Sequence, residues 1–131
     1  MRGHGIYNLA PPPAIDQITI NATSDANGVA SGRVVWLANY LAPPEQPAPD
    51  WVGWIWRIDV TSLSVAGNVA TLGGTVVSDN RFPENIGCQV GFIVTDNGNG
   101  AANPDVLELV DSPGCVFGGP NSHRGGNFTV K

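Results

Sequence analysis

The protein contains few charged residues, and basic residues are the scarcer kind. Only 13% of its 131 residues are charged, and six Lys and Arg stand against eleven Asp and Glu, for a net charge of −5. Coiled coils and disordered tails are usually rich in charge, so the composition argues against both. A protein that binds nucleic acid needs a basic face, and an anionic membrane surface attracts basic residues. Neither nucleic acid nor a membrane is therefore expected as a partner.

Long apolar runs are also missing. No stretch approaches the roughly 20 apolar residues that cross a bilayer as a helix. The first residues, MRGHGIYNLAPPPA, lack the apolar stretch of a secretory signal peptide. The protein is therefore expected either to be cytosolic or to be a mature segment to which Met1 was added.

Cysteine is scarce, and its count helps to choose between these locations. The two cysteines, Cys88 and Cys115, stand 27 positions apart in a small, loop-rich and lysine-poor chain. Such a setting favours a disulfide over two separate thiols, and closing this loop stabilises a fold by about 3–4 kcal/mol. A disulfide predicts an extracellular location, with the signal peptide absent from this chain.

Helical periodicity is missing as well, and a two-residue alternation recurs in its place. No window of eleven or more residues spaces apolar side chains by three and four without Gly, Pro or a β-branched residue intervening. Alternating apolar residues between turns are typical of strands. Strands are expected at residues 15–24, 29–40, 50–60, 62–65, 69–77, 88–96, 105–110 and 127–131, the last of which can pair with residues 5–9.

Glycine and proline divide these strands. Residues 42–50 contain four prolines, which lack the N–H that a central strand needs, and are expected to form an exposed loop. Short turns between sequential strands predict an antiparallel sheet, and Gly73-Gly74 within a strand predicts a bulge or bend at which a sheet can coil. Residues 1–131 are therefore predicted to form one all-β domain. The expected fold is a small antiparallel β-barrel of about eight or nine strands with long Pro/Gly loops, and a β-sandwich is the alternative.

Two stretches resemble a known family. They are VTSLSVAGNVATLGGTVV at residues 60–77 and FIVTDNGNGAANPDVLEL at residues 92–109, in which an AGN turn, a GG pair and a DNG turn follow in order. Together they resemble a family of small, uncharacterised, secreted bacterial proteins. The resemblance implies secretion and a β fold, with no established activity. Ser62 stands where that family usually has cysteine, so the predicted Cys88–Cys115 disulfide depends on the residues of this chain alone.

The richest aromatic stretch is DWVGWIWRIDV at residues 50–60. In a strand, Trp54 and Trp56 share one face, with Trp36 available from a neighbouring strand, while Trp51 faces the other way. These rings can fill a core, because each buries up to about 250 Å². They can also form an aromatic surface or a barrel mouth that holds a sugar or a small apolar ligand. The candidate ligand-binding residues are Trp36, Tyr40, Trp51, Trp54 and Trp56.

Other polar groups each allow two interpretations. Asp96 and Asp105 offer oxygen ligands for calcium, but the EF-hand spacing is not met, and side-chain hydrogen bonds within a turn are the simpler interpretation. Arg57 and Asp59 share a strand face, and Tyr40 can join them. Inside a barrel these three could promote a cyclisation or isomerisation, whereas on the outside Arg57 and Asp59 would form a surface ion pair. No metal and no cofactor is expected.

The function expected from these observations is that of a secreted, non-catalytic β domain that binds a carbohydrate or a small apolar ligand. A first alternative is a structural subunit of an extracellular homo-oligomer or filament. A second alternative is a barrel enzyme of the cyclase or isomerase type with a Trp-lined lumen. The sequence has neither a nucleophile elbow nor a phosphate loop, so a non-enzymatic role is favoured.

Overall fold

The computed structural model describes residues 1–9, 14–40, 53–98, 105–111, 115, 121–124 and 127–130. Strands account for most of this part of the chain, and a short 3₁₀ helix, η1 (Pro83–Asn85), follows β5. The strands are β1 (Arg2–Leu9), β2 (Ala14–Ser24), β3 (Ala30–Tyr40), β4 (Ile55–Ala66), β5 (Val69–Asp79), β6 (Gln89–Thr95), β7 (Val106–Asp111), β8 (Asn121–Arg124) and β9 (Asn127–Thr129). The predicted all-β fold class is confirmed.

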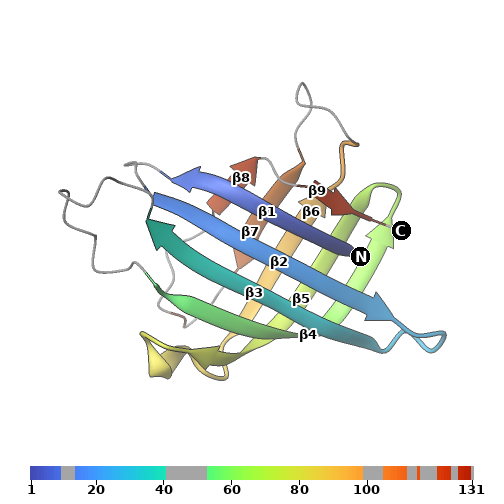
Figure 1. Ribbon diagram of the computed structural model, residues 1–131. Helices are drawn as coiled ribbons and strands as arrows, with labels where there is room; N and C mark the ends of the chain where they lie inside the picture. The colour runs from blue at the N-terminus through green and yellow to red at the C-terminus, as the bar shows by residue number, and fades with distance from the viewer. Residues whose placement is uncertain are drawn as a thin grey trace.

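These strands form one sheet in the order β8-β7-β6-β5-β4-β3-β2-β1-β9. Every strand pairing among the described residues is antiparallel, as predicted. The sheet curls like half a barrel, with β2 and β3 crossing in front of β5 and β6 in Figure 1. The strand β9 pairs with the start of β1, so the two ends of the chain lie side by side. A single continuous curled sheet differs from the two packed sheets of the sandwich alternative, and closure into a barrel stays a prediction.

The turn between β2 and β3 follows from the sequence DANG at residues 25–28. One carboxylate oxygen of Asp25 accepts the backbone N–H groups of Asn27 at 2.8 Å and Val29 at 2.9 Å. Gly28 has a φ of 79°, a conformation that glycine adopts without a steric penalty. This turn fixes the register of the hairpin from Ser24↔Ala30 onward.

The hairpin of β4 and β5 confirms two further predictions. Gly67, with a φ of 61°, and Asn68 form the tight turn between the strands. Farther along, the β4–β5 register shifts between Val60 and Ser62, opposite Gly73 and Gly74. A Cβ on Gly74 would lie 2.7 Å from the carbonyl oxygen of Asp59, so glycine permits the close approach of the two backbones. The glycine pair therefore marks the bend that it predicted.

The core lies on the concave side of the curled sheet and is filled by alternate residues of the strands. In β4 and β5, for example, buried and more exposed positions follow one another from Trp56 to Val60 and from Ala70 to Val76. The most deeply buried large side chains are Phe92, Phe128, Ile18, Ile20, Ile58, Leu72, Leu107, Leu109, Val34, Val76 and Val94. The two-residue alternation of the sequence thus becomes one apolar interior.

Two differences from the predicted strands concern the ends of the chain. The strand β8 falls in a stretch expected to be irregular, because its four residues lie between Pro/Gly-rich segments. The strand β9 pairs with Arg2–His4 of β1 and not with residues 5–9. The predicted exposed loop at residues 42–50 lies outside the described residues, as do residues 50–52 at the start of the Trp-rich stretch.

Candidate functional site

Two of the candidate tryptophans belong to the core. Trp36 of β3 and Trp56 of β4 are partners across the strand pair. Their rings stack with centroids 5.0 Å apart and planes inclined by 11°. The two residues are only 3% and 5% exposed, and the ring of Phe92 lies 6.2 Å from that of Trp36. The core interpretation of Trp56 is confirmed, and ligand binding by these buried rings stays a prediction.

Trp54 is half-buried and is held in place by a hydrogen bond. Its ring lies 4.9 Å from the ring of Trp56 and meets the ring of Phe82 edge-on at 5.0 Å. Its indole N–H donates to Oδ1 of Asp79 at 2.8 Å. A ring fixed on three sides keeps one orientation, so Trp54 can offer a small rigid surface but not a broad aromatic platform.

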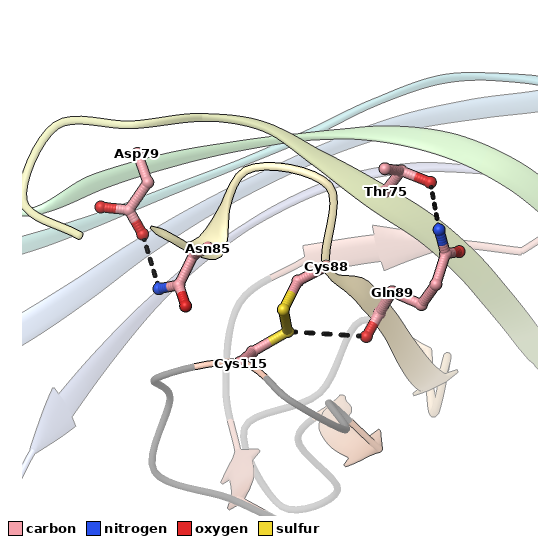
Figure 2. Close-up of a disulfide and its surroundings, with 6 residues drawn as sticks. All are labelled: Thr75, Asp79, Asn85, Cys88, Gln89 and Cys115. Carbon is pink, nitrogen blue, oxygen red and sulfur yellow. Dashed lines mark hydrogen bonds between the residues drawn. A yellow bond between two sulfur atoms is a disulfide. The ribbon is translucent and has the colours of Figure 1, made fainter. Parts of the chain in front are cut away.

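Asp79, the last residue of β5, is only 5% exposed and accepts hydrogen bonds from the segment that follows β5. Its Oδ1 also accepts the backbone N–H groups of Arg81 at 2.9 Å and Phe82 at 2.8 Å. Its Oδ2 accepts the side-chain amide of Asn85, which is fully buried, at 2.9 Å (Figure 2). Four donors surround one buried carboxylate, which explains how a charged group is tolerated there.

The remaining aromatic candidates are not brought together by the described structure. Tyr40 is the last residue of β3, where its backbone pairs with Ala14, and its side chain lies outside the described part. Trp51 lies outside the described residues altogether. The ligand-binding roles of Tyr40 and Trp51 therefore stay predictions.

The predicted disulfide is confirmed. Cys88 and Cys115 are bonded, with their Cα atoms 5.7 Å apart, and both pack against the core. The sulfur of Cys115 lies 3.8 Å from the carbonyl oxygen of Gln89, whose side-chain amide donates to Thr75 of β5 at 2.9 Å (Figure 2). The bond ties the start of β6 to the segment between β7 and β8.

Asp96 and Asp105, at the two ends of the β6–β7 connection, hold the last strand. Asp105 is 2% exposed, and its Oδ2 accepts the N–H of Phe128 at 2.7 Å. Oδ2 of Asp96 accepts the N–H of Val130 at 3.1 Å. Successive N–H groups of a strand point to opposite sides, so the N–H groups of Phe128 and Val130, two positions apart, point to the same side. That side faces away from β1, which pairs with the opposite edge of β9. The two carboxylates supply acceptors that a neighbouring strand would otherwise provide, and they are called the carboxylate clamp below.

The other oxygens of the carboxylate clamp are also engaged. Oδ1 of Asp105 accepts the N–H of Asn97 at 2.8 Å, and Oδ1 of Asp96 accepts the N–H of Gly98 at 2.9 Å. All four oxygens therefore accept backbone N–H groups. The turn interpretation is confirmed for Asp96 by the bond from Gly98, whereas Asp105 bonds to residues 8 and 23 positions away. Among the described residues, no three His, Cys, Asp or Glu side chains are grouped so as to hold a metal ion.

The predicted ion pair of Arg57 with Asp59 is wrong. Asp59 pairs with Arg33 of β3, its partner across the strands, with Nε and Oδ1 3.2 Å apart. Residues directly opposite on neighbouring strands are about 4.5–5.5 Å apart, closer than residues two positions along one strand. Arg57 is exposed and Asp59 is on the same outer face, so these two do not form the polar cluster inside a barrel that the enzyme alternative required.

An open hollow of about 480 Å³ lies on the outer face beside this ion pair. The β3–β4 ladder ends at Arg33↔Asp59, and after Val60 the strand β4 continues along β5 past its register shift. Figure 1 shows β4 turning away from β3 in this region. The hollow, called the outer hollow below, is lined by residues 30–33 of β3, Asn21 of β2, and Asp59 and Val60 of β4.

Sequence reasoning missed the outer hollow because its residues come from three strands, and only Asp59 among them was considered as a functional residue. The only signals were indirect. Gly73-Gly74 predicted a bend, but not that β4 would separate from β3 at this point and continue along β5. Gly32 was a second signal. Its φ is 129°, and a Cβ there would clash with the Asn21 carbonyl oxygen, so glycine allows the backbones of β2 and β3 to lie close together at the rim.

Comparison of the chain with protein-family models, with curated proteins and with solved structures found no match. Within the described residues, no helix has the length and apolar character needed to cross a membrane.

Proposed function

We propose that this chain is an extracytoplasmic, non-catalytic β domain that binds its ligand in the outer hollow. The observation that carries the proposal is the contrast between the two faces of the sheet. The concave side is filled by apolar side chains, including Trp36 and Trp56, whereas the outer face has a hollow with polar groups of both signs. Ligand sites are concave and combine apolar surface with a few polar groups, which is the composition of the outer hollow.

The proposal includes a closed barrel. The strands β8 and β9 are separated by two residues only, and they pair with β7 and β1, the strands next to the two ends of the sheet. In this proposal, β8 and β9 act together as a closing strand that links β7 to β1. The carboxylate clamp supports this closure, because it joins β9 to the β6–β7 connection. Closure leaves few exposed strand edges, which suits a protein that stays dispersed outside the cell.

The extracytoplasmic location is supported by the Cys88–Cys115 disulfide, since disulfides persist in oxidising compartments. Membership of the small secreted bacterial family is part of the same proposal. The Gly67-Asn68 turn and the Gly73-Gly74 bend give physical roles to residues that carry the resemblance. Fractionation of the producing cells, followed by alkylation of free thiols, tests the location. A protein found only in the cytosol with both thiols alkylated contradicts it.

The binding role is tested by nuclear magnetic resonance of ¹⁵N-labelled protein with a mixture of small probes: simple sugars, amino acids, carboxylates and short alcohols. We expect the largest shifts at the amides of residues 31–33 and 59–60, which line the outer hollow. Shifts that cluster around Trp54 and Phe82 instead would move the site to the aromatic end of the sheet. A homo-oligomer or filament subunit, the first alternative, predicts sedimentation that depends on concentration.

A further inference from the structure

We infer that the ligand of the outer hollow is a neutral carbohydrate, recognised through two neighbouring hydroxyl groups. This inference depends on the proposed function, because it names the ligand class of the same site. It is carried by the chemistry of the rim and the floor of the hollow.

The rim presents donors and acceptors side by side. Arg33 and Asp59 use Nε and Oδ1 for their ion pair, and their side chains are 56% and 48% exposed. Within the described residues, the two terminal nitrogens of Arg33 and Oδ2 of Asp59 have no protein partner. One hydroxyl of a sugar can therefore donate to the carboxylate while its neighbour accepts from the guanidinium. The ion pair places these two groups next to each other before the ligand arrives.

Two further polar side chains extend this arrangement. Asn21 offers both a donor and an acceptor, and Ser31 offers a hydroxyl that lies 3.4 Å from the hydroxyl of Thr23. Groups that donate and accept suit a ligand with several hydroxyl groups, each of which does both, and a sugar has this property. A small apolar ligand would leave these rim groups without partners, which disfavours it.

The floor and the charge of the hollow point to the same ligand class. Ala30, which is partly buried, supplies a small apolar surface against which the C–H face of a sugar ring can pack, whereas Val60 is only 5% exposed and belongs to the core. Arg33 and Asp59 balance each other in charge, so the site carries no net attraction for a phosphate or a carboxylate. A neutral sugar fits both properties. Because the hollow is open and shallow, we expect a dissociation constant of about 0.1–1 mM for a monosaccharide.

The test is a titration of ¹⁵N-labelled protein with glucose, galactose, mannose, xylose and N-acetylglucosamine, each alone, and with glycine, acetate, butanol and trialanine as non-sugar probes. We expect at least one sugar to shift the amides of residues 31–33 and 59–60. The deoxy form of that sugar, which lacks one hydroxyl of the neighbouring pair, should bind at least about 10-fold more weakly.

Variants assign the effect to the rim. Arg33→Ala and Asp59→Asn should each weaken binding of the sugar at least about 10-fold, because each removes a charged partner of a hydroxyl. Arg57→Ala is the matched control, since Arg57 is an exposed arginine two positions from Asp59 and does not line the hollow. It should leave the dissociation constant within about 2-fold. An unchanged dispersion of amide signals shows that each variant is folded.

The possible results separate the inference from the proposed function. Binding of a sugar at the hollow that is lost in the rim variants supports both. Binding of trialanine or another non-sugar probe alone at the hollow overturns the carbohydrate inference and leaves the binding function standing. If no probe shifts the amides of the hollow, both are overturned.

Discussion

Asp79 and Asp59 carry the same side chain in opposite surroundings, and the difference decides what each contributes. Asp79 is 5% exposed and accepts four hydrogen bonds, one of them from Trp54. Asp59 lies on the outer face and makes one ion pair with an exposed arginine. An exposed ion pair contributes less than about 1 kcal/mol, whereas donors buried without an acceptor cost about 1–3 kcal/mol.

The isosteric replacements Asp79→Asn and Asp59→Asn should therefore differ in stability. In Asp79→Asn, an NH₂ group replaces one carboxylate oxygen. At least one of the four groups that donate to Asp79 then faces another donor and loses its acceptor. We expect a loss of about 1–3 kcal/mol in the free energy of unfolding, measured by urea denaturation. Asp59→Asn, the matched control, should lose less than about 1 kcal/mol. Equal losses in the two variants would show that the buried hydrogen bonds around Asp79 contribute no more than a surface pair.

At the scale of the strands, the bend in β4 and β5 depends on two glycines with unequal surroundings. A Cβ on Gly74 would meet the backbone of Asp59 at 2.7 Å and the side chain of Ile58, which is buried. A Cβ on Gly73 would meet mainly the side-chain oxygen of Ser62, which can rotate away. Backbone atoms of a paired strand cannot give way so easily, so the two positions should tolerate alanine differently.

We expect Gly74→Ala to lower the free energy of unfolding by about 1–3 kcal/mol, because a methyl group there displaces the β4 backbone. Gly73→Ala should change it by less than about 1 kcal/mol, since alanine restricts the unfolded chain and its clash is relieved by a rotamer change of Ser62. Thermal denaturation of both variants measures the difference. If Gly73→Ala is the more damaging of the two, the close approach of the strands at Gly74 is not what requires glycine.

Most of the strands and turns could be predicted from the sequence, because they depend on residues close together in the chain. The Asp25–Gly28 turn, the Gly67-Asn68 turn and the Gly73-Gly74 bend each follow from residues within a few positions. Contacts between distant residues were not predictable in the same way. The bond from Trp54 to Asp79 and the pair of Arg33 with Asp59 join residues 25 and 26 positions apart. The outer hollow depends on such a long-range pairing, which is why the sequence alone gave only indirect signs of it.

At the scale of the whole molecule, the disulfide links β6 to the segment that precedes the closing strand. On the chain-entropy model, a loop of 27 residues is worth about 3–4 kcal/mol. We expect the double variant Cys88→Ser with Cys115→Ser to unfold at a lower urea concentration by a corresponding amount. Reduction of the native protein should produce the same loss, and a reductant should have no further effect on the double variant. A reduced native protein as stable as the oxidised one would contradict this role.

The pairing of β9 with β1 is the other connection at this scale, and it depends on a few groups. The strand β9 has three residues, and its outer edge is held by the carboxylate clamp. The buried ring of Phe128 adds an anchor in the core. In Asp105→Asn, the amide retains one acceptor oxygen, so either Phe128 or Asn97 loses the acceptor of its N–H. Because the affected bonds are local, we expect β9 to open without unfolding the rest of the sheet.

Hydrogen exchange measures this opening strand by strand. In Asp105→Asn, the amides of β9 and of Arg2–His4 in β1 should exchange about 10- to 100-fold faster, which corresponds to a local loss of about 1–3 kcal/mol. The amides of β5 and β6, which pair with each other in the middle of the sheet, should keep their protection. Glu108→Gln is the matched control, because Glu108 lies on β7 outside the carboxylate clamp, and it should leave all these rates unchanged. Uniformly faster exchange in Asp105→Asn would mean that the carboxylate clamp stabilises the whole sheet, and unchanged exchange in β9 would mean that the strand is held without it.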